Sequence, residues 1–176
     1  MASELPLRQA TERDVPALVA LVNSAYRGDS SRAGWTTEAD LLGGIRIDRE
    51  RLETAVGGNG HVVLIHESDD GLVCCVALQK TGEDCYLGML TTRPTLQARG
   101  FGRQMIEAAE AWAANRWQVR AMHMTVLEQR PELIAWYERR GYRVTTERKP
   151  FPYGDERWGL PTRNDLSFVV LRKTLR

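Results

Sequence analysis

Two glycines, Gly100 and Gly102, open a predicted helix directly after a predicted strand and loop, and their placement suits phosphate binding. Glycine lets a phosphate approach the backbone, because no Cβ stands in the way. A helix N-terminus also directs unpaired N–H groups and the positive end of the helix dipole at one point. Arg99 and Arg103 add positive charge beside it. The segment over residues 90–103 therefore predicts a pyrophosphate-binding turn.

Two other phosphate-binding motifs fit this segment less well. A Walker A loop needs GxxxxGK followed by Ser or Thr, which the sequence lacks. A dinucleotide-binding fingerprint needs a third glycine where Met105 stands. In the structural alternative the glycines only begin a helix, but the preceding strand and the flanking arginines favour phosphate binding.

The run Gln97-Ala98-Arg99-Gly100-Phe101-Gly102 resembles the Gln/Arg-x-x-Gly-x-Gly/Ala motif of the GNAT acyltransferase superfamily. The resemblance extends over roughly residues 7–175 and implies that backbone amides of this turn hold the pyrophosphate of acetyl-CoA. It also implies a bulge that splays the preceding strand from the strand at residues 125–127. An N–H near Leu90 would then polarise the thioester carbonyl. The cofactor-binding residues implied are Leu90, Thr92, Gln97, Arg99, Gly100, Phe101, Gly102 and Arg103.

Tyr137 is the predicted general acid. The stretch over residues 133–142 resembles the second recognisable GNAT segment, an apolar helix that ends in Tyr-x-x-x-Gly-Phe/Tyr. The resemblance implies that this phenol protonates the departing CoA thiolate; the alternative is core packing on an apolar helix face. Many GNAT members carry Asn seven residues before this tyrosine, but here the position is Arg130.

An amine that arrives as ammonium must lose a proton before it attacks the thioester. Glu128 follows a predicted strand and is the first candidate for this base, acting directly or through water; Glu83 and Asp84 are alternatives. A solvated surface role is the simpler interpretation of each of these carboxylates. No Cys or Ser stands in a recognisable nucleophile setting, which favours direct transfer in a ternary complex.

Two loops outside the cofactor motifs, over residues 30–38 and 149–165, could hold the acceptor, since loops on a rigid scaffold often carry specificity. Aromatic residues would wall an apolar slot, and an arginine would bind an anionic group. The alternative is a long hairpin whose aromatic residues cover the sheet edge and whose arginines pair with Asp155 and Glu156. The candidate acceptor contacts are Trp35, Tyr153, Trp158 and Arg163.

The elements that must position these residues read along the chain as β-α-α-β-β-β-α-β-α-β-β. Thr11 is a predicted N-cap for a helix that ends near Tyr26, because apolar residues follow it at helical spacing. A second helix is predicted from Thr36 or Thr37 to Leu52, weakened by two adjacent glycines.

Asp69-Asp70-Gly71 predicts a hairpin turn between strands over residues 61–66 and 72–78. Meandering strands followed by strand-helix-strand crossovers predict an α/β fold, with a mixed, mostly antiparallel sheet of about seven strands and helices on both faces. This is also the architecture that the GNAT resemblance implies. The remaining predicted elements are strands over 5–10, 85–91, 121–127, 142–148 and 166–175, and helices over 100–116 and 131–141.

Length, net charge and the lengths of the apolar runs limit the classes of function that fit this chain. A length of 176 residues suits a single domain over residues 1–176. The net charge of +1 gives no electrostatic argument for a nucleic-acid partner. No apolar run approaches the ~20 residues that span a bilayer, and no signal peptide is recognisable, so we expect a cytoplasmic protein without a membrane partner. The adjacent Cys74 and Cys75 point to opposite faces of a strand, which favours reduced thiols over a metal site.

The sequence thus predicts an acyl-CoA-dependent N-acetyltransferase with acetyl-CoA as co-substrate and no metal. The acceptor is a primary amine of a small molecule or a peptide. A catalytically silent acyl-CoA-binding sensor or interaction module is the alternative function. A monomer and a homodimer both fit the sequence, and homodimers are common on the fold that the resemblance implies.

Overall fold

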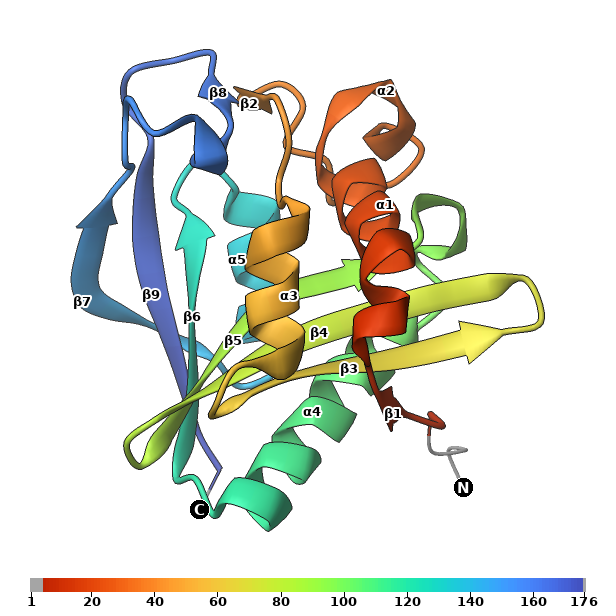
Figure 1. Cartoon of the computed structure of the whole chain (residues 1–176). Coiled ribbons are helices and arrows are strands. Elements are labelled where there is room, and N and C mark those ends of the chain that lie inside the picture. The colour runs from red at the N-terminus through yellow and green to blue at the C-terminus, as the bar shows by residue number, and fades with distance from the viewer. Residues whose placement is uncertain (1–4, 176) are drawn as a thin grey trace.

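The computed structural model describes residues 5–175, and its centre is a mixed sheet of seven strands in the order β1-β3-β4-β5-β6-β9-β7 (Figure 1). Only the pairing of β5 with β6 is parallel. The predicted mostly antiparallel sheet is therefore confirmed. The strands are β1 (Arg8–Gln9), β3 (His61–Ser68), β4 (Gly71–Thr81), β5 (Asp84–Thr92), β6 (Ala121–Leu127), β7 (Arg143–Pro150) and β9 (Ser167–Thr174).

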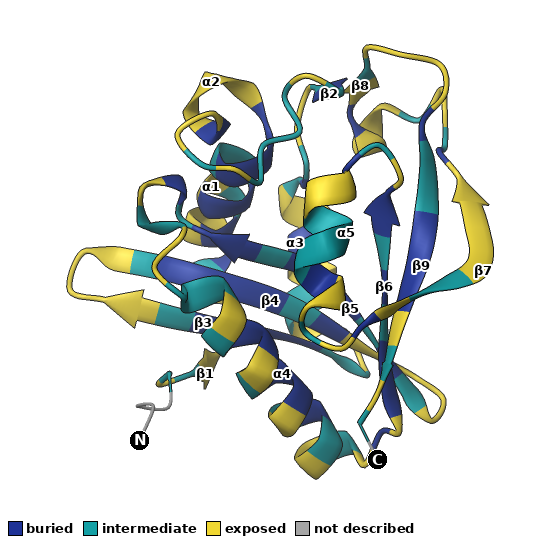
Figure 2. Ribbon diagram, turned by 180° about the vertical axis from the view of Figure 1, so that it is seen from behind, coloured by how far each residue is buried: buried dark blue, intermediate teal, exposed yellow. Residues whose placement is uncertain are grey.

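Helices cover both faces of this sheet, as predicted. One face carries α1 (Val15–Tyr26) and α3 (Arg49–Gly57), and the other carries α4 (Phe101–Trp117), with α5 (Pro131–Glu138) beside it (Figures 1 and 2). Within residues 5–175, no helix is both long enough and apolar enough to cross a membrane.

Alternation along the central strands divides the core into two layers. On β3, Val62 and Leu64 pack with α4, whereas Val63 and Ile65 pack with α1 and α3. This is the two-residue period of a strand that is buried on both faces. Cys74 and Cys75 fall into opposite layers and are free thiols, as the sequence predicts.

The predicted helix from Thr36 or Thr37 to Leu52 is wrong over its first part. Residues 42–43 instead form the short strand β2 (Leu42–Gly43), and α3 begins only at Arg49. Gly44 has φ +74°, a backbone conformation that a helix cannot continue through. The helix starts where Asp48 caps it, accepting a hydrogen bond from the Arg51 amide at 2.8 Å.

The predicted acceptor loop over residues 149–165 pairs with a segment that the sequence placed in the second helix. β2 pairs antiparallel with β8 (Leu160–Pro161), which lies in the connection between β7 and β9 together with the short 3₁₀ helix η3 (Glu156–Trp158). A further short helix, α2 (Gly28–Ser31), follows α1. Figure 1 shows β2 and β8 together above the carboxyl end of β6 and the amino end of the antiparallel β9. This small sheet roofs one end of the molecule.

Candidate active site

Strands β5 and β6 separate toward their carboxyl ends. Their parallel pairing covers only Asp84–Tyr86 against Ala121–His123, although both strands continue beyond it. The register of β5 against β4 also shifts, and Met89 has φ +58° at that shift. A bulge bends the strand that carries it, and Figure 1 shows the two strands diverging. The structure thus contains the bulge and the strand separation that the GNAT resemblance implies.

The turn over residues 97–103 has an unusual backbone. Ala98 has φ +61° and Gly100 has φ +90°, and the first hydrogen bond of α4 runs from the Gln104 amide to the Gly100 carbonyl at 3.1 Å. Within the part of the chain that the structure describes, the amides of residues 98–103 have no hydrogen-bond acceptor. Six unpaired donors at a helix N-terminus are an arrangement that can bind an anion.

A cavity of about 280 Å³, here called the turn cavity, lies directly beside this turn. Gly102 lines it, and a Cβ built on Gly102 would lie 3.5 Å from the Trp136 ring and 3.7 Å from Thr92 Oγ1. The glycine therefore keeps open space that a side chain would fill. The predicted cofactor residues that line the cavity are Leu90, Thr92, Gln97, Gly100, Phe101, Gly102 and Arg103.

Arg99 and Arg103 differ in their relation to this cavity. The Arg99 side chain is exposed and lies outside the lining of the turn cavity, so its contribution there is its backbone amide. Arg103 lines the cavity together with Arg140. The guanidinium of Arg140 stacks 3.5 Å from the centroid of the Trp136 ring and donates to the Trp136 carbonyl at 2.6 Å. The positive charge of these two arginines in the cavity lining suits a phosphate group.

Gln97 fastens a neighbouring loop to the turn. Its Oε1 accepts from the Trp35 amide at 2.8 Å, and its Nε2 donates to Thr36 Oγ1 at 2.8 Å and to the Thr92 carbonyl at 3.2 Å. The side chain thus joins the loop after α2 to the end of β5. Trp35, a predicted acceptor contact, consequently lines the turn cavity, with its ring centroid 6.2 Å from that of Trp136.

Arg130, which stands where many family members carry Asn, has a positioning role in the structure. Its side chain is buried, and Nη1 donates to the Thr36 carbonyl at 3.3 Å. The same guanidinium pairs with Glu132 at 2.6 Å and lies 3.6 Å from Glu38. Arg130 therefore holds the same loop as Gln97 does, from the side of α5.

A second cavity of about 90 Å³ lies where β5 and β6 separate, and residues of both strands line it. It is here called the roofed cavity, because Leu42 of β2 and Trp158 of η3 bound it. Trp158 is one of the predicted acceptor contacts. Four residues line both cavities, so this set forms the wall between them: Tyr26, Leu90, Leu133 and Tyr137.

Two tyrosines stand in this shared wall. Tyr137 is buried, and burial raises the pKa of its phenol well above the ordinary range. Burial likewise raises the pKa of Tyr26 to about 12, and its hydroxyl donates to the Leu90 carbonyl. Both phenols therefore stay protonated at neutral pH, and a protonated phenol can donate a proton.

The remaining predicted site residues lie outside both cavity linings. Glu128 is exposed; its Oε2 accepts from Ser167 Oγ at 2.7 Å, and Arg148 lies 3.7 Å from its carboxylate. Tyr153 donates its hydroxyl to the Arg163 carbonyl at 2.9 Å. Arg163 pairs with Asp165 rather than with Asp155 or Glu156.

The two other carboxylates considered as bases lie far from the shared wall along β5. Asp84 is at the start of this strand and pairs with Arg172 at 3.0 Å, and Glu83 pairs with Arg120 at 3.2 Å. Neither residue lines the turn cavity or the roofed cavity.

Sequence reasoning missed several residues of both cavities. Tyr26 is the last residue of α1 and Arg27 follows it, and this position was the only local feature of the sequence that could have indicated a site. Trp136 stands next to Tyr137 and could have been inferred from that position. The lining residues that sequence analysis did not name as site residues include Tyr26, Trp136 and Arg140 in the turn cavity, and Arg27, Glu38, Arg46, Phe151 and Phe168 in the roofed cavity.

Residues 17–142 match the family described as Acetyltransferase (GNAT) family. The chain therefore belongs to the GNAT acetyltransferase family and is an acyltransferase, as the turn and the second segment predict. GNAT acetyltransferases use acetyl-CoA as co-substrate and act on amine acceptors.

Solved structures of N-acetyltransferases share the fold. The ribosomal-protein-S18-alanine N-acetyltransferase from Escherichia coli has a TM-score of 0.72 at 14% identity, over 97% of this chain and 93% of that chain. A ribosomal-protein-alanine N-acetyltransferase from Brucella melitensis has a TM-score of 0.71 at 19% identity, over 97% and 99%. A spermidine/spermine N-acetyltransferase from Vibrio cholerae has a TM-score of 0.68 at 15% identity, over 98% and 93%. No curated protein sequence matches the chain significantly.

Proposed function

We propose that this protein transfers the acetyl group of acetyl-CoA directly to a primary amine, with both substrates bound at once. The observation that carries the proposal is a wall common to the two cavities, formed by Tyr26, Leu90, Leu133 and Tyr137. A donor in one cavity and an acceptor in the other would meet at this wall. Direct transfer needs such a meeting point and no covalent acyl-enzyme.

The thiols agree with a mechanism that does not use an enzyme nucleophile. Cys74, Cys75 and Cys85 are all buried, and burial raises the pKa of each thiol to about 12. A thiol with such a pKa is almost wholly protonated at neutral pH and is a poor nucleophile.

The turn cavity fits the donor. The free amides of residues 98–103 would hold the pyrophosphate, and Arg103 and Arg140 would add positive charge to its phosphates. Leu90 and Thr92, at the end of β5, would contact the pantetheine arm that leads to the gap. The Leu90 region would also polarise the thioester carbonyl, because the bulge removes it from the regular β4–β5 register.

The proposed reaction then follows from bond changes at the shared wall. The neutral amine nitrogen attacks the thioester carbonyl carbon, a C–N bond forms, and the C–S bond breaks. Sulfur leaves with the electron pair as a thiolate, and Tyr137 gives it a proton. The nitrogen loses a proton to a base, and Tyr137 regains a proton from solvent before the next turnover.

Glu128 is the proposed base and acts through water. Its carboxylate follows Leu127, which lines the roofed cavity, although Glu128 itself lies outside that lining. A chain of water molecules would have to connect the Glu128 carboxylate to the amine in the roofed cavity. Replacement of Glu128 by Gln tests this role, because kcat should fall if the carboxylate takes the proton and stay unchanged if the proton leaves directly to solvent.

The test of the function is thiol release from acetyl-CoA with a panel of amines, amino acids and peptides. Release that depends on an added amine, together with a mass increase of the acceptor by one acetyl group, is the expected result. The fold does not choose the acceptor, since similar structures include enzymes named for a ribosomal-protein alanine and for spermidine. Tight CoA binding without product from any amine would contradict catalysis and favour a sensor role.

A further inference from the structure

The roofed cavity carries more positive than negative charge. Two guanidinium groups, those of Arg27 and Arg46, line it, and Glu38 is its one carboxylate among the described residues. Glu38 is already shared, because it accepts from Arg27 Nη1 at 2.5 Å and lies 3.6 Å from Arg130. Glu38 is therefore shared by Arg27 and Arg130. Arg130 has Glu132 as a second partner.

Arg27 has an N–H donor without a hydrogen-bond acceptor among the described residues. Its side chain is only 4% exposed, yet its Nε is buried with no hydrogen-bond acceptor among residues 5–175. The hydrogen bonds that it makes to Glu38 and to the Tyr26 carbonyl both come from Nη1. A buried donor without a partner costs free energy, and a guanidinium edge matches the two oxygens of a carboxylate.

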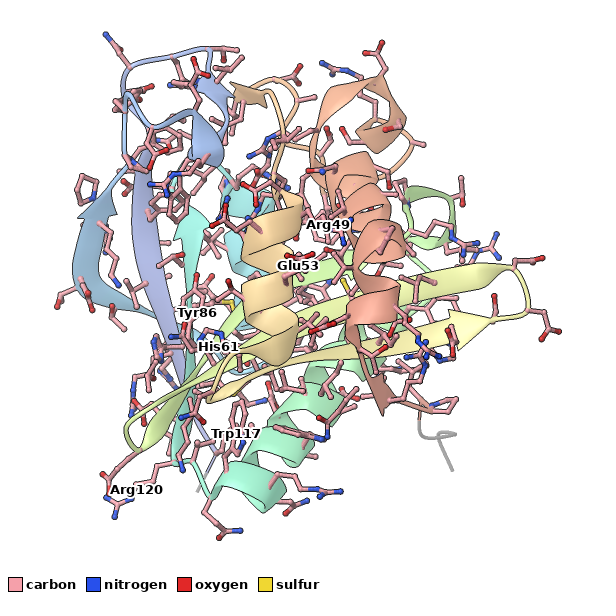
Figure 3. The ribbon with its side chains drawn as sticks, in the orientation of Figure 1. Arg49, Glu53, His61, Tyr86, Trp117 and Arg120 are labelled. Atoms are coloured by element: carbon pink, nitrogen blue, oxygen red, sulfur yellow. The ribbon has the colours of Figure 1, made fainter. Side chains whose placement is uncertain are left out.

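Arg46 is the second unsatisfied cation. In the described part of the chain its guanidinium has neither an ion pair nor a hydrogen bond, and it stacks 5.6 Å from the centroid of the Tyr26 ring. Tyr26 belongs to the shared wall, so this charge lies close to the predicted reaction point. Arg46 also lines a neighbouring groove of about 360 Å³, whose lining includes Tyr86 and His61, both labelled in Figure 3.

Aromatic side chains form part of the apolar lining of the cavity, beside leucine, methionine and valine residues. The ring centroids of Phe151 and Phe168 are 5.9 Å apart, and those of Trp158 and Phe168 are 6.3 Å apart. Tyr86 also lines the cavity. An apolar group of the acceptor would pack here, while its anion would meet a guanidinium. The roofed cavity of about 90 Å³ shares Arg46, Tyr86 and Trp158 with the neighbouring groove of about 360 Å³, so the apolar body would occupy both.

We propose that the acceptor is a small primary amine that carries a carboxylate and an apolar body, as an aromatic amino acid does. The inference rests on the proposed acetyl transfer and specifies its substrate. Uncompensated cations also favour the neutral form of the reacting amine, because a nearby positive charge lowers the pKa of an ammonium group. The same charges disfavour a polyamine, which brings further positive charge into the site.

Matched pairs of amines test the inference. Phenylalanine and tyrosine each have a partner without the carboxylate, phenethylamine and tyramine, and spermidine serves as the polycation. We expect kcat/KM to be about 10- to 100-fold higher for the carboxylated member of each pair, as one or two charge-assisted hydrogen bonds would give. A phosphonate analogue of phenylalanine separates recognition of a carboxylate from recognition of any oxyanion.

Arg46→Gln removes the one cation in the described lining of the roofed cavity that has no ion pair, and leaves a shorter, neutral polar side chain. It should lower the ratio of kcat/KM values within each pair by about tenfold or more, mainly through KM. Arg49→Gln is the matched control, because Arg49 is exposed on α3 and pairs with Glu53 at 2.6 Å (Figure 3). The control should leave the ratio unchanged.

A binding arm separates failure of this inference from failure of the proposed function. 3-Phenylpropanoate has the carboxylate but no amine, and calorimetry on the CoA-saturated enzyme should detect its binding and a loss of affinity of about tenfold or more in Arg46→Gln. That result supports the inference even if no amine is acetylated. Preferential turnover of phenethylamine, tyramine or spermidine would overturn the inference and leave the acetyltransferase intact. Absence of both carboxylate binding and carboxylate preference would overturn it equally.

Discussion

At the scale of single residues, the shared wall presents two phenols, and their contacts suggest different roles. Tyr26 donates its hydroxyl to the Leu90 carbonyl, so its proton already has an acceptor in the protein. For the hydroxyl of Tyr137, no hydrogen-bond partner is found within residues 5–175; its ring packs edge-on against Trp136 and Tyr142. Tyr137 is thus free to donate to a sulfur, and Tyr26 positions the bulge.

Tyr137→Phe should reduce kcat by roughly 10²–10⁴-fold, because the thiolate would leave without its proton donor. CoA affinity should change little, since the hydroxyl contributes no contact to the turn. Stopped-flow thiol release and calorimetry measure the two quantities. The Tyr142→Phe variant is a control, because that hydroxyl donates to Glu110 at 2.9 Å in the core and its loss should affect stability rather than turnover.

The pH dependence of kcat gives a second test of Tyr137. Burial raises its pKa above the ordinary value of about 10. A donor with a raised pKa keeps its proton until the pH exceeds that raised value. We therefore expect no alkaline loss of kcat from this group between pH 8 and 10. An alkaline limb below pH 9 that disappears in Tyr137→Phe would contradict the assignment.

At the scale of elements, one loop is held over the turn from two directions. Gln97 binds residues 35–36 from the turn, and Arg130 binds the same residues from the start of α5. The identity of residue 130 follows from this contact. The long arginine side chain contacts both the Thr36 carbonyl and Glu38. The shorter side chain of Asn would not reach both.

Gln97→Glu should loosen this loop, because a carboxylate cannot donate to Thr36 Oγ1 or to the Thr92 carbonyl. Hydrogen exchange of the Trp35 amide in the absence of CoA should become faster by roughly tenfold or more, as loss of one or two hydrogen bonds would give. Gln129→Glu is the control, since Gln129 donates to the Asp165 carbonyl at 2.7 Å, on a different loop. Equal protection of Trp35 in both variants would show that Gln97 does not hold the loop.

The junction between β1 and α1 gives a pH-dependent contribution to stability. Arg8 donates to both oxygens of Asp14 at 2.9 Å, and this lowers the pKa of Asp14 to about 2, from an ordinary 3.8. A lowered folded-state pKa stabilises the fold above the unfolded value, and the effect disappears as the pH falls through the folded value.

Asp14→Asn should therefore lower the free energy of unfolding near pH 7, and the difference from the parent protein should shrink between about pH 4 and pH 2. Urea denaturation across this range measures it. Asp69→Asn, in the exposed turn before β4, is a control that should show no such difference. A difference that persists unchanged at pH 2 would contradict the role of the Arg8 pair.

Elements with strong local patterns were predictable from sequence. β6 spans Ala121–Leu127 as predicted, and Pro131 begins α5 because its missing N–H is harmless in the first turn. The two-residue strands β2 and β8 were not predictable, since they are too short for periodicity and exist only because distant loops pair.

The candidate site likewise has one part that was predictable from sequence and one part that was not. The turn over residues 97–103 was readable because its backbone geometry is encoded locally by glycine and the helix start. The roofed cavity was not readable, because Arg27, Arg46 and Phe151 come from separate segments that only the tertiary fold unites. Sequence analysis found Trp158 there, but it also named Tyr153 and Arg163, which lie outside the cavity lining.

At the scale of the whole molecule, β5 and β6 separate, and the turn cavity and the roofed cavity meet at the wall that they share. The donor would enter from the side of α4 and α5, and the acceptor from the side of β2 and η3. Binding of CoA at the turn is the claim on which every later step depends.

The affinity of CoA for Gly102→Glu, measured by calorimetry beside Gly102→Gln, tests this claim most directly. Either residue suits the first turn of a helix better than glycine, so the fold should persist. We predict that Gln weakens binding by filling the space before Trp136 and Thr92, and that Glu weakens it further, by at least about 100-fold, through repulsion of the pyrophosphate. Unchanged CoA affinity in a folded Gly102→Glu protein would contradict the account.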